Sequence, residues 1–481
     1  MNNSVFNPFL PAGEYIPDGE PRVFGDRVYL YGSHDRFNGA IFCLNDYVSY
    51  SAPLENLSDW RYEGIIYRKT QDPGNRLGLR LLFAPDVVQG SDNRYYLYYT
   101  LDFSGIMGVA VSDRPSGPFS FHGHIRDSGG ARWGRRTGDH LPFDPGVLVD
   151  RGRVYLYSGF AVKIPAPLTG FRSLKSEGGV VVELETDMIT IKKEPLLLFP
   201  AKGPGSYSDH EFFEASSIRK INDLYYFIYS SRHNHELCYA VSERPDSGFQ
   251  FAGTLVSLGD IGLSGITQEG KGRNYLGNTH GSLLQHNGKF FIFYHRQTNR
   301  NSFSRQACAE ELPLGGNGLP VQAEVTSCGL NGKPLPGSGE YGAYIACNLG
   351  SLRGVGRYDS YCPRFLFRKH PYITQEGKDG RPGAYQYIAN MQNGALVGFK
   401  YFEFVQSGTI TIKARGAAEG EITVFCSEQG DKVAEFPLHL RNRRRWTEIR
   451  TSFSPPVGVH PLYFRFSGKG KMDFLSFTFL R

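Results

Sequence analysis

Short apolar segments alternate with polar turns along the first part of the chain, and one arrangement of them occurs five times. The leading residues are Asp18, Asp86, Asp144, Glu214 and His280, which are separated by 68, 58, 70 and 66 positions. Runs of this length, bounded by turn residues and rich in aromatics, predict antiparallel β-strands joined as hairpins. After each leading residue come a short apolar segment, a polar turn and a segment rich in Tyr and Phe, in residues 16–31, 83–100, 143–159, 213–231 and 278–295.

Each repeat has room for two further strands before the next repeat begins. Such strands are expected at 106–111 and 119–122 in the second repeat, and at 237–241 and 249–253 in the fourth. A small antiparallel sheet cannot bury both of its faces alone, so repeated sheets are expected to pack around a common axis. The pattern therefore predicts a five-bladed β-propeller over residues 1–325, with the leading residues converging at one mouth of a central channel.

The pattern changes after Arg305. Residues 306–312 are expected to form a closing strand, and residues 326–350, which are rich in Gly and Pro, are expected to form a linker. Alternating apolar and polar positions return in residues 351–481, which predicts a C-terminal β-sandwich. Its clearest strands are expected at 409–413, 421–425, 461–466 and 472–479.

Composition supports an all-β fold and excludes several classes of function. Aromatic residues make up 14% of the chain, which also has 58 Gly and 28 Pro, and no segment carries a sustained helical period. The net charge of +6 is too small for a chain of 481 residues to indicate a nucleic acid or membrane partner. The 7 cysteines include no Cys-x-x-Cys pair, so neither a disulfide framework nor a structural zinc site is expected.

The N-terminal residues lack a basic segment followed by an apolar run, so a cytoplasmic location is expected. The oligomeric state stays open.

Three of the leading residues are carboxylic acids with contrasting neighbours. Glu214 follows two phenylalanines, which would raise the pKa of its carboxyl by desolvation and suit it to donate a proton. Asp18 lies in a polar loop, where its carboxylate is suited to remain ionised and activate water. Two carboxyl groups in these roles, roughly 6.5 to 9.5 Å apart, are what inverting glycoside hydrolysis requires. A third acid, Asp86, would hydrogen-bond Glu214 and hold its pKa and orientation.

The leading motifs resemble those of glycoside hydrolase family 43, whose members have five-bladed propellers. Residues 84–87, Ala-Pro-Asp-Val, match one family motif without change, and residues 213–215 match the Glu-(Gly/Ala) motif. Residues 144–145 match the Asp-Pro of the third blade. The first motif departs from the family pattern, because residues 17–21, Pro-Asp-Gly-Glu-Pro, stand where Ala-Asp-Pro is expected.

The resemblance implies a role for each acid. Asp18 would be the general base, Asp86 the acid that modulates the pKa, and Glu214 the general acid. Asp18 lies 11 residues before Tyr29, as the base of the family lies before its Tyr-rich segment. Glu20 is the alternative to Asp18 as the base.

The resemblance also implies contacts with substrate and with an ion. Arg305 matches the family arginine that hydrogen-bonds sugar hydroxyls beside the acid. His280 resembles the fifth-blade histidine that faces the channel and often holds a calcium or sodium ion, usually through water. No cofactor is expected to be required for the chemistry, so any Ca²⁺ or Na⁺ would lie on the propeller axis without reacting.

Planar and hydrogen-bonding side chains near the expected mouth are candidate sugar contacts. These are His34, Asp35, Trp133 and Phe213. The long polar loop at residues 127–140 is expected to lie over the pocket mouth and restrict it to chain ends.

The C-terminal region resembles carbohydrate-binding modules of family 6. The resemblance lies chiefly in residues 398–404 and 458–466. It departs at residues 472–475, Met-Asp-Phe-Leu, which replace the Asn and aromatic pattern that those modules use for ligands. The expected role of this domain is therefore packing against the propeller.

Together these features predict an exo-acting inverting glycosidase with an oligosaccharide substrate. An α-L-arabinofuranoside is the first choice, because residues 18–21 look most like the arabinofuranosidase branches of the family. A β-D-galactofuranoside has nearly the same ring stereochemistry and comes second, and a β-D-xyloside comes third. The alternatives are a sugar-binding propeller without turnover, against which the three acids argue, and a scaffold without sugar affinity.

Overall fold

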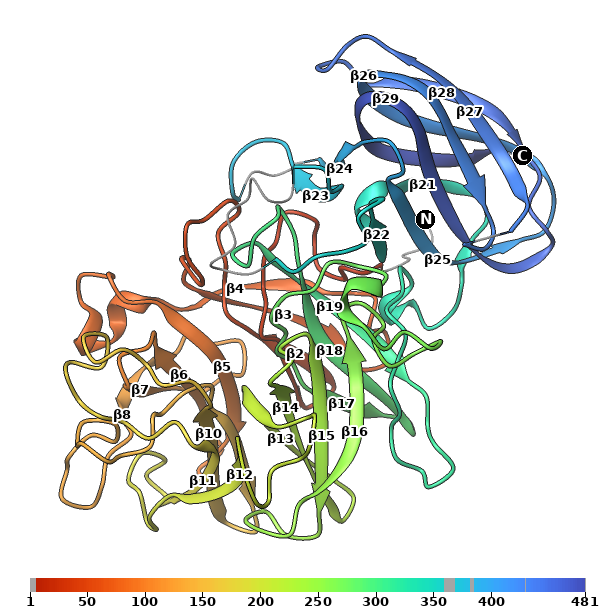
Figure 1. Ribbon diagram of the computed structural model, residues 1–481. Coiled ribbons are helices and arrows are strands. Elements are labelled where there is room, and N and C mark those ends of the chain that lie inside the picture. The colour runs from red at the N-terminus through yellow and green to blue at the C-terminus, as the bar shows by residue number, and fades with distance from the viewer. Residues whose placement is uncertain (1–5, 359–367, 381–384, 429, 481) are drawn as a thin grey trace.

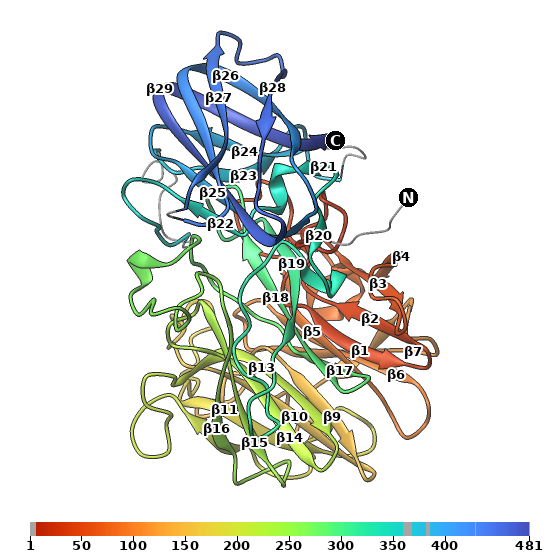
Figure 2. The ribbon, with the colours of Figure 1, turned by 90° about the vertical axis from the view of Figure 1, so that its right-hand side faces the viewer.

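The chain folds into a ring of five antiparallel sheets followed by a C-terminal sheet domain (Figure 1, Figure 2). This computed structural model describes residues 6–358, 368–380, 385–428 and 430–480. Blades one to four each have 4 strands and blade five has 3 in the described chain. The predicted all-β fold with a five-bladed propeller is therefore confirmed.

The strands of each blade follow one another along the chain, and the first strand of each blade lies next to the axis. The bounds are as follows: β1 (Glu20–Phe24), β2 (Arg27–Tyr31), β3 (Tyr47–Pro53) and β4 (Arg61–Tyr67); β5 (Leu82–Gln89), β6 (Tyr95–Leu101), β7 (Met107–Ser112) and β8 (Ser120–His124); β9 (Gly146–Asp150), β10 (Arg153–Phe160), β11 (Gly178–Leu184) and β12 (Leu196–Pro200); β13 (Phe212–Ile221), β14 (Leu224–Ser231), β15 (Glu236–Ser242) and β16 (Gln250–Ser257); β17 (Leu283–His286), β18 (Lys289–Gln297) and β19 (Arg305–Leu312).

Tyr-rich second strands build the packing between blades. Tyr29 and Tyr31 of β2 pack against Leu82 and Val87 of β5, in a core shared by blades one and two. Each of the other neighbouring pairs of blades shares a separate core of the same kind. Because side chains alternate between the two faces of a strand, each blade contributes to the core on either side of it. This packing keeps the first strands together at the axis.

Residues from both ends of the propeller sequence close the ring. The Phe9 amide donates to the Ala307 carbonyl at 3.3 Å. The Asn7 side chain donates to the Ala309 carbonyl at 3.0 Å and accepts from the Ala309 amide at 3.0 Å. The predicted closing strand at 306–312 lies within β19, which therefore has the N-terminal segment along its outer edge.

The C-terminal domain wraps its strands around one apolar core. The predicted linker at 326–350 is wrong, because residues in it form short strands of this sheet: β20 and β22 pair with β25, and β21 pairs with β29. Its Gly and Pro residues lie in and around these very short strands, where Pro is tolerated. The bounds are β20 (Leu335–Pro336), β21 (Gly339–Gly342), β22 (Asn348–Gly350), β23 (Tyr372–Gln375), β24 (Gln386–Met391), β25 (Leu396–Phe404), β26 (Gly408–Phe425), β27 (Lys432–Leu440), β28 (Thr447–Phe453) and β29 (Gly458–Leu480).

Buried polar contacts join the two domains. Tyr15 donates its hydroxyl to Gln375 Oε1 at 2.6 Å and accepts from Gln386 Nε2 at 2.9 Å. Lys400, which is 1% exposed, lies 3.2 Å from an Asp260 oxygen and 2.8 Å from a Glu324 oxygen. Such contacts require a fixed geometry, so the second domain is held in one orientation on the propeller.

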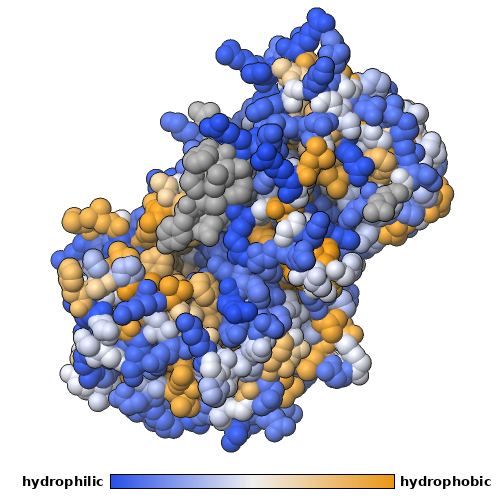
Figure 3. Space-filling view, viewed as in Figure 1, coloured by the Kyte–Doolittle hydropathy of each residue, from blue (hydrophilic) through white to orange (hydrophobic). Residues whose placement is uncertain are grey.

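The remaining features of the described chain are simple. Its helices are single turns: η1 (Lys69–Gln71), η2 (Pro73–Asn75), η3 (Glu269–Lys271), η4 (Gly329–Asn331) and η5 (Ala343–Ile345). None of these turns has the length or apolar character needed to cross a membrane. The described cysteines are all free thiols. On the face shown in Figure 3, hydrophobic residues lie in small groups among hydrophilic ones.

Candidate active site

A cavity of about 270 Å³ opens at the end of the propeller where the axial strands begin. It brings together three carboxylic acids, a histidine and an arginine: Asp18, Asp144, Glu214, His280 and Arg305. Four of these are leading residues of the sequence repeats. Its size is just below the roughly 300 to 1,000 Å³ typical of pockets for drug-sized ligands.

An unusual backbone conformation marks the start of the axial strands. The φ angle is positive at Asp18 (58°), Ala84 (34°), Asp144 (47°) and Ala215 (67°), one residue in each of blades one to four. A non-glycine residue in this region costs about 1–3 kcal/mol and persists only where its surroundings fix it. The pairing of β13 with β14 also shifts register around Glu214, as β-bulges beside active sites do. These turns direct the neighbouring side chains toward the axis.

The four residues with positive φ have the left-handed backbone conformation. Side chains near them lie at two levels along the channel. In blade four the residue just before the left-handed one is Glu214, which lines the cavity, as Phe83 and Phe143 do in blades two and three. Two positions after the left-handed residue, Glu20 and Asp86 lie deeper on the axis. Because side chains of a strand alternate, positions two apart point to the same side at different depths.

Asp18 is fixed in the cavity by two contacts. Its Oδ1 accepts a hydrogen bond from Arg305 Nη1 at 3.0 Å, and its backbone amide donates to His295 Nδ1 at 3.2 Å. Burial raises the pKa of the Asp18 carboxyl, but Arg305 and the neighbouring His295 and His280 together lower it more, so the pKa lies below its ordinary value. The Arg305 guanidinium is itself held by a bidentate pair with Asp35, at 2.9 and 3.1 Å. Asp18 is therefore a carboxylate that stays ionised.

Glu20, the alternative base, points to the axis below the cavity. Its Oε2 accepts from Arg219 at 2.6 Å and from the Ser217 hydroxyl at 3.0 Å. Burial raises the pKa of its carboxyl, but Arg219, His280 and Arg22 together lower it more, to about 2. Glu20 does not line the cavity, so the geometry favours Asp18 over Glu20 as the group that meets a substrate.

Glu214 has the opposite electrostatic environment. Burial and the neighbouring negative charge of Asp144 raise the pKa of its carboxyl to about 8. Asp144 is held in place by the Ala215 amide, which donates to Asp144 Oδ2 at 3.1 Å. Glu214 is therefore protonated at neutral pH beside a carboxylate and within reach of the same cavity as Asp18.

Six phenylalanines form one side of the cavity and connect blades one to four. Neighbouring rings along this arc lie 4.7 to 6.4 Å apart between centroids. The arc excludes water from one side of the acids, which explains the desolvation that raises the pKa of Glu214. Only Phe213 was predicted from the sequence, although the Phe just before the left-handed residue in blades two and three was a usable signal. The members of this phenylalanine arc are Phe42, Phe83, Phe103, Phe143, Phe160 and Phe213.

Comparison with known proteins agrees with this site. The model of glycosyl hydrolases family 43 matches residues 7–320. This chain belongs to glycosyl hydrolase family 43. It is 48% identical over 484 residues to a xylosidase/arabinosidase of Thermoclostridium stercorarium, covering 99% of both chains. It is 30% identical to a xylosidase/arabinosidase of Bacteroides ovatus, over 60% of this chain and 87% of that one.

A solved family 43 structure supports the fold. A GH43_1 enzyme from Xanthomonas citri, complexed with xylotriose, superposes with a TM-score of 0.52 at 22% identity. The match covers 67% of this chain and 94% of that chain. Membership of family 43 and the two relatives identify the present chain as a glycosidase, as the sequence predicted.

Within this family 43 fold, Asp86 does not lie where the sequence placed it. Both of its oxygens are bonded to Arg22, and they also accept from the Val87 and Val147 amides, each at 2.8 Å. Asp86 does not line the cavity, and no described contact joins it to Glu214. The repeat pattern aligned Asp86 with Asp18, which is two residues out of register. In the structure, Asp86 corresponds to Glu20 and not to Asp18. The charge next to Glu214 belongs to Asp144.

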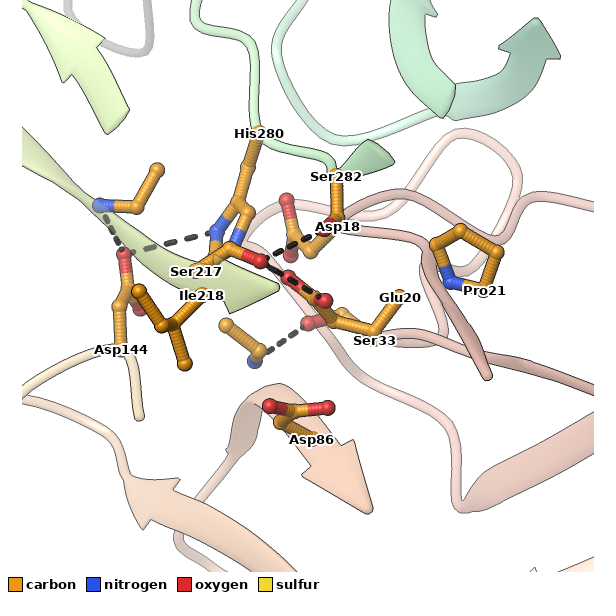
Figure 4. A network of polar contacts seen from close by, with 12 residues as sticks. Asp18, Glu20, Pro21, Ser33, Asp86, Asp144, Ser217, Ile218, His280 and Ser282 are labelled. Atoms are coloured by element: carbon orange, nitrogen blue, oxygen red, sulfur yellow. Dashed lines mark hydrogen bonds and ion pairs between the residues drawn. The ribbon is translucent and has the colours of Figure 1, made fainter. Parts of the chain in front are cut away.

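His280 lies between two carboxylates (Figure 4). Its Nδ1 is 3.6 Å from Asp144 Oδ2 and its Nε2 is 3.8 Å from Glu20 Oε1. Burial lowers the pKa of the imidazole, but Glu20 and Asp144 raise it more, to about 9. A protonated imidazole has no free lone pair, so in this protonation state His280 would contact a cation through water, as the resemblance implies.

The other predicted contacts divide between the cavity and its surroundings. Arg305 and Phe213 line the cavity. Asp35 lies behind Arg305 and orients it, and His34 bonds the Asp46 carbonyl at 2.8 Å. Trp133 is buried in the core between blades two and three. Asp35, His34 and Trp133 are therefore not cavity-lining residues.

The predicted cover of the cavity also differs. The loop at 127–140 supplies none of the described lining residues. Residues that follow the last matched family position line the cavity instead, namely Arg357 and Tyr358. The sequence pattern does not indicate this contribution, because the alternation of residues from 351 onward predicts a separate sandwich domain.

Two groups of side chains in the described chain have the spacing of metal ligands, and neither includes His280. One consists of His210, Glu236 and Cys238, in which His210 Nδ1 already bonds Glu236 at 2.8 Å. The other is a cluster of His233, His235 and Glu269, in which Glu269 is already paired with Arg357. In both groups a carboxylate is paired with a residue of the chain itself.

Proposed function

We propose that this protein is an exo-acting, inverting glycosidase that removes terminal β-D-xylosyl and α-L-arabinofuranosyl residues from oligosaccharides. The observation that carries the proposal is that Asp18 and Glu214 share one cavity with pKa values shifted in opposite directions. Two titratable groups whose environments separate their pKa values in this way suit a base and an acid.

The chemistry follows from these protonation states. Asp18, as carboxylate, accepts a proton from a water molecule as the water oxygen bonds to the anomeric carbon. Glu214, as carboxylic acid, gives its proton to the glycosidic oxygen as the bond to the anomeric carbon breaks. The products are a sugar of inverted configuration and an alcohol, and the two acids have exchanged protonation states.

Asp144 takes the role that the sequence assigned to Asp86. Its carboxylate is held against the Ala215 amide, beside Glu214, and its charge raises the pKa of the acid. The contact of Asp144 with His280 also keeps the positive charge of the imidazole close to the cavity. We therefore propose Asp144 as the residue that keeps Glu214 protonated at neutral pH.

Two observations support the choice of sugar. Two relatives, one of them matching almost the full length, carry the name xylosidase/arabinosidase, which favours both pentoses equally rather than arabinofuranose first. The cavity of about 270 Å³ at the end of the axis suits one terminal sugar ring rather than a chain running through it.

A panel of aryl glycosides tests the proposal. Initial rates on p-nitrophenyl β-D-xylopyranoside, α-L-arabinofuranoside and β-D-galactofuranoside are expected to show turnover of the two pentosides. Proton NMR during hydrolysis of the xyloside is expected to show α-xylose first. Turnover of the galactofuranoside alone would replace the sugar assignment, and β-xylose as the first product would exclude inversion. Absence of turnover on every glycoside would contradict the enzymatic proposal.

In the pH profile, kcat/KM is expected to fall above about pH 8, because deprotonation of Glu214 removes the acid. This fall is the alkaline limb of the profile. Replacing Asp144 with Asn removes the negative charge that favours the protonated acid. This limb is then expected to move to lower pH by roughly 1 to 2 units. Asp86→Asn is the matched control and is expected to leave the limb in place. A limb that moves with Asp86 and not with Asp144 would restore the role predicted from the sequence.

We propose that no metal ion is needed for the chemistry, because His280 already supplies positive charge between Glu20 and Asp144. Dialysis against EDTA, followed by assay in metal-free buffer, is expected to leave kcat within about twofold of its starting value. A large loss that Ca²⁺ or Na⁺ restores would place an ion on the axis and overturn this expectation.

A further inference from the structure

Some of the polar residues that line the cavity lie outside the family-matched region. Besides the phenylalanine arc and the acids, its lining includes Asn234, Ser302, Arg357 and Tyr358. Arg357 and Tyr358 lie beyond residue 320, where the family match ends, and follow β22 of the C-terminal sheet. The second domain therefore contributes directly to the wall of the cavity.

Backbone pairing holds this segment in place. The Leu276 amide donates to the Gly356 carbonyl at 2.9 Å, and the Tyr358 amide donates to the Leu276 carbonyl at 2.6 Å. Leu276 is followed directly by Gly277 and Asn278, which also line the cavity. Residues 356–358 thus form a short rim against the segment that leads to His280.

Within the described part of the chain, Arg357 donates hydrogen bonds through one nitrogen. Its Nη2 donates to the His233 carbonyl at 2.9 Å and to Glu269 Oε1 at 2.7 Å. Its Nε and Nη1 donate to no residue within the described ranges. The side chain is 29% exposed, and it also lines the cavity. A guanidinium carries five N–H donors in a fixed plane, which leaves several for a ligand.

The chemistry of the rim indicates the ligand. Glu269 offsets the charge of Arg357, so the free donors suit neutral hydroxyls better than a second carboxylate. Tyr358 stacks on Tyr275 with ring centroids 4.9 Å apart and an interplanar angle of 15°, and this places a rigid aromatic ring in the wall. Hydroxyl-binding donors beside a flat ring suit a sugar ring.

We propose that Arg357 and Tyr358 form the subsite for the sugar next to the one that is released. Arg357 hydrogen-bonds the hydroxyls of this neutral leaving-group sugar, and Glu269 positions Arg357. The proposal rests on the glycosidase function above. It makes the C-terminal domain a source of specificity and not only a packing partner.

Binding and turnover of a disaccharide test the subsite. In the Arg357→Ala variant, kcat/KM on β-1,4-xylobiose is expected to fall about 10-fold to 30-fold, as for loss of hydrogen bonds to a charged group. On p-nitrophenyl β-D-xylopyranoside, whose leaving group has no sugar hydroxyls, the loss is expected to stay below about threefold. Arg353→Ala, an exposed arginine of the same segment that does not line the cavity, is the matched control.

Two further measurements separate the subsite from a general defect. Calorimetry on a Glu214→Gln background is expected to show that Arg357→Ala lowers the affinity for xylobiose about 10-fold and leaves the affinity for xylose unchanged. Glu269→Gln is expected to give a smaller loss on xylobiose, because Arg357 remains but is less well oriented. Equal losses on both substrates, or unchanged affinity for xylobiose, would overturn the proposal. Failure of the glycosidase function itself would instead appear as absent turnover in the wild-type protein.

Discussion

Replacing Asp18 with Asn is expected to lower kcat by about 10³-fold to 10⁴-fold. An amide cannot accept the proton of the attacking water, whereas its oxygen can still accept the 3.0 Å hydrogen bond from Arg305. The fold and KM are therefore expected to change little. Azide needs no deprotonation, so it is expected to restore part of the rate and give a glycosyl azide of inverted configuration. Steady-state kinetics with and without azide measure both effects.

Glu20→Gln is the matched control for Asp18. It removes a carboxylate two residues away that points to the same axis but does not reach the cavity. Its kcat is expected to stay within about threefold of wild type. The free energy of unfolding is expected to fall by about 3–5 kcal/mol, because Arg219 is left buried without its counter-charge. If Glu20→Gln removes activity and Asp18→Asn does not, the base is Glu20.

Replacing Glu214 with Gln is expected to have an effect that depends on the leaving group. On xylobiose, kcat/KM is expected to fall by about 10³-fold, because the departing sugar oxygen needs a proton. On 2,4-dinitrophenyl β-D-xylopyranoside the loss is expected to be about tenfold or less, since that leaving group departs as an anion. The decline in rate above about pH 8 is also expected to disappear.

Glu310→Gln is the control for the Glu214 variant. Burial raises the pKa of Glu310 to about 8 as well, but this carboxyl lies outside the cavity and bonds Thr326 and Tyr294. Its replacement is expected to alter thermal stability and not the dependence on the leaving group. Equal losses on both substrates for Glu214→Gln would exclude a role in protonating the leaving group.

The repeat pattern was enough to predict the blades, because each is a local run of strands that packs only against its neighbours. It also brought Asp18, Glu214 and His280 to one mouth of the channel, where all three line the cavity, and the family resemblance added Arg305. The depth of a side chain along the channel was not visible in the sequence. That depth depends on where the backbone turns, and Ala84, not Asp86, has the left-handed conformation in blade two.

The contribution of Arg357 and Tyr358 was hidden for a different reason. These residues follow a Gly- and Pro-rich stretch that has the composition of a linker, and their contacts are with Leu276, His233 and Glu269. Pairing between segments so distant in the chain leaves no periodic signal. The composition of such a stretch gives its local conformation but not the surface on which it packs.

The contact between Asp18 and Arg305 sets an order of events during synthesis. The two residues are 287 positions apart in the chain, and Arg305 belongs to the last strand of the propeller. At about 5–20 residues per second, a ribosome needs roughly 15 to 60 s to reach Arg305 after it has passed Asp18. Throughout that interval the nascent chain carries Asp18 without the guanidinium that fixes its carboxylate. The newly made protein therefore becomes an enzyme only when its fifth blade emerges and the ring closes.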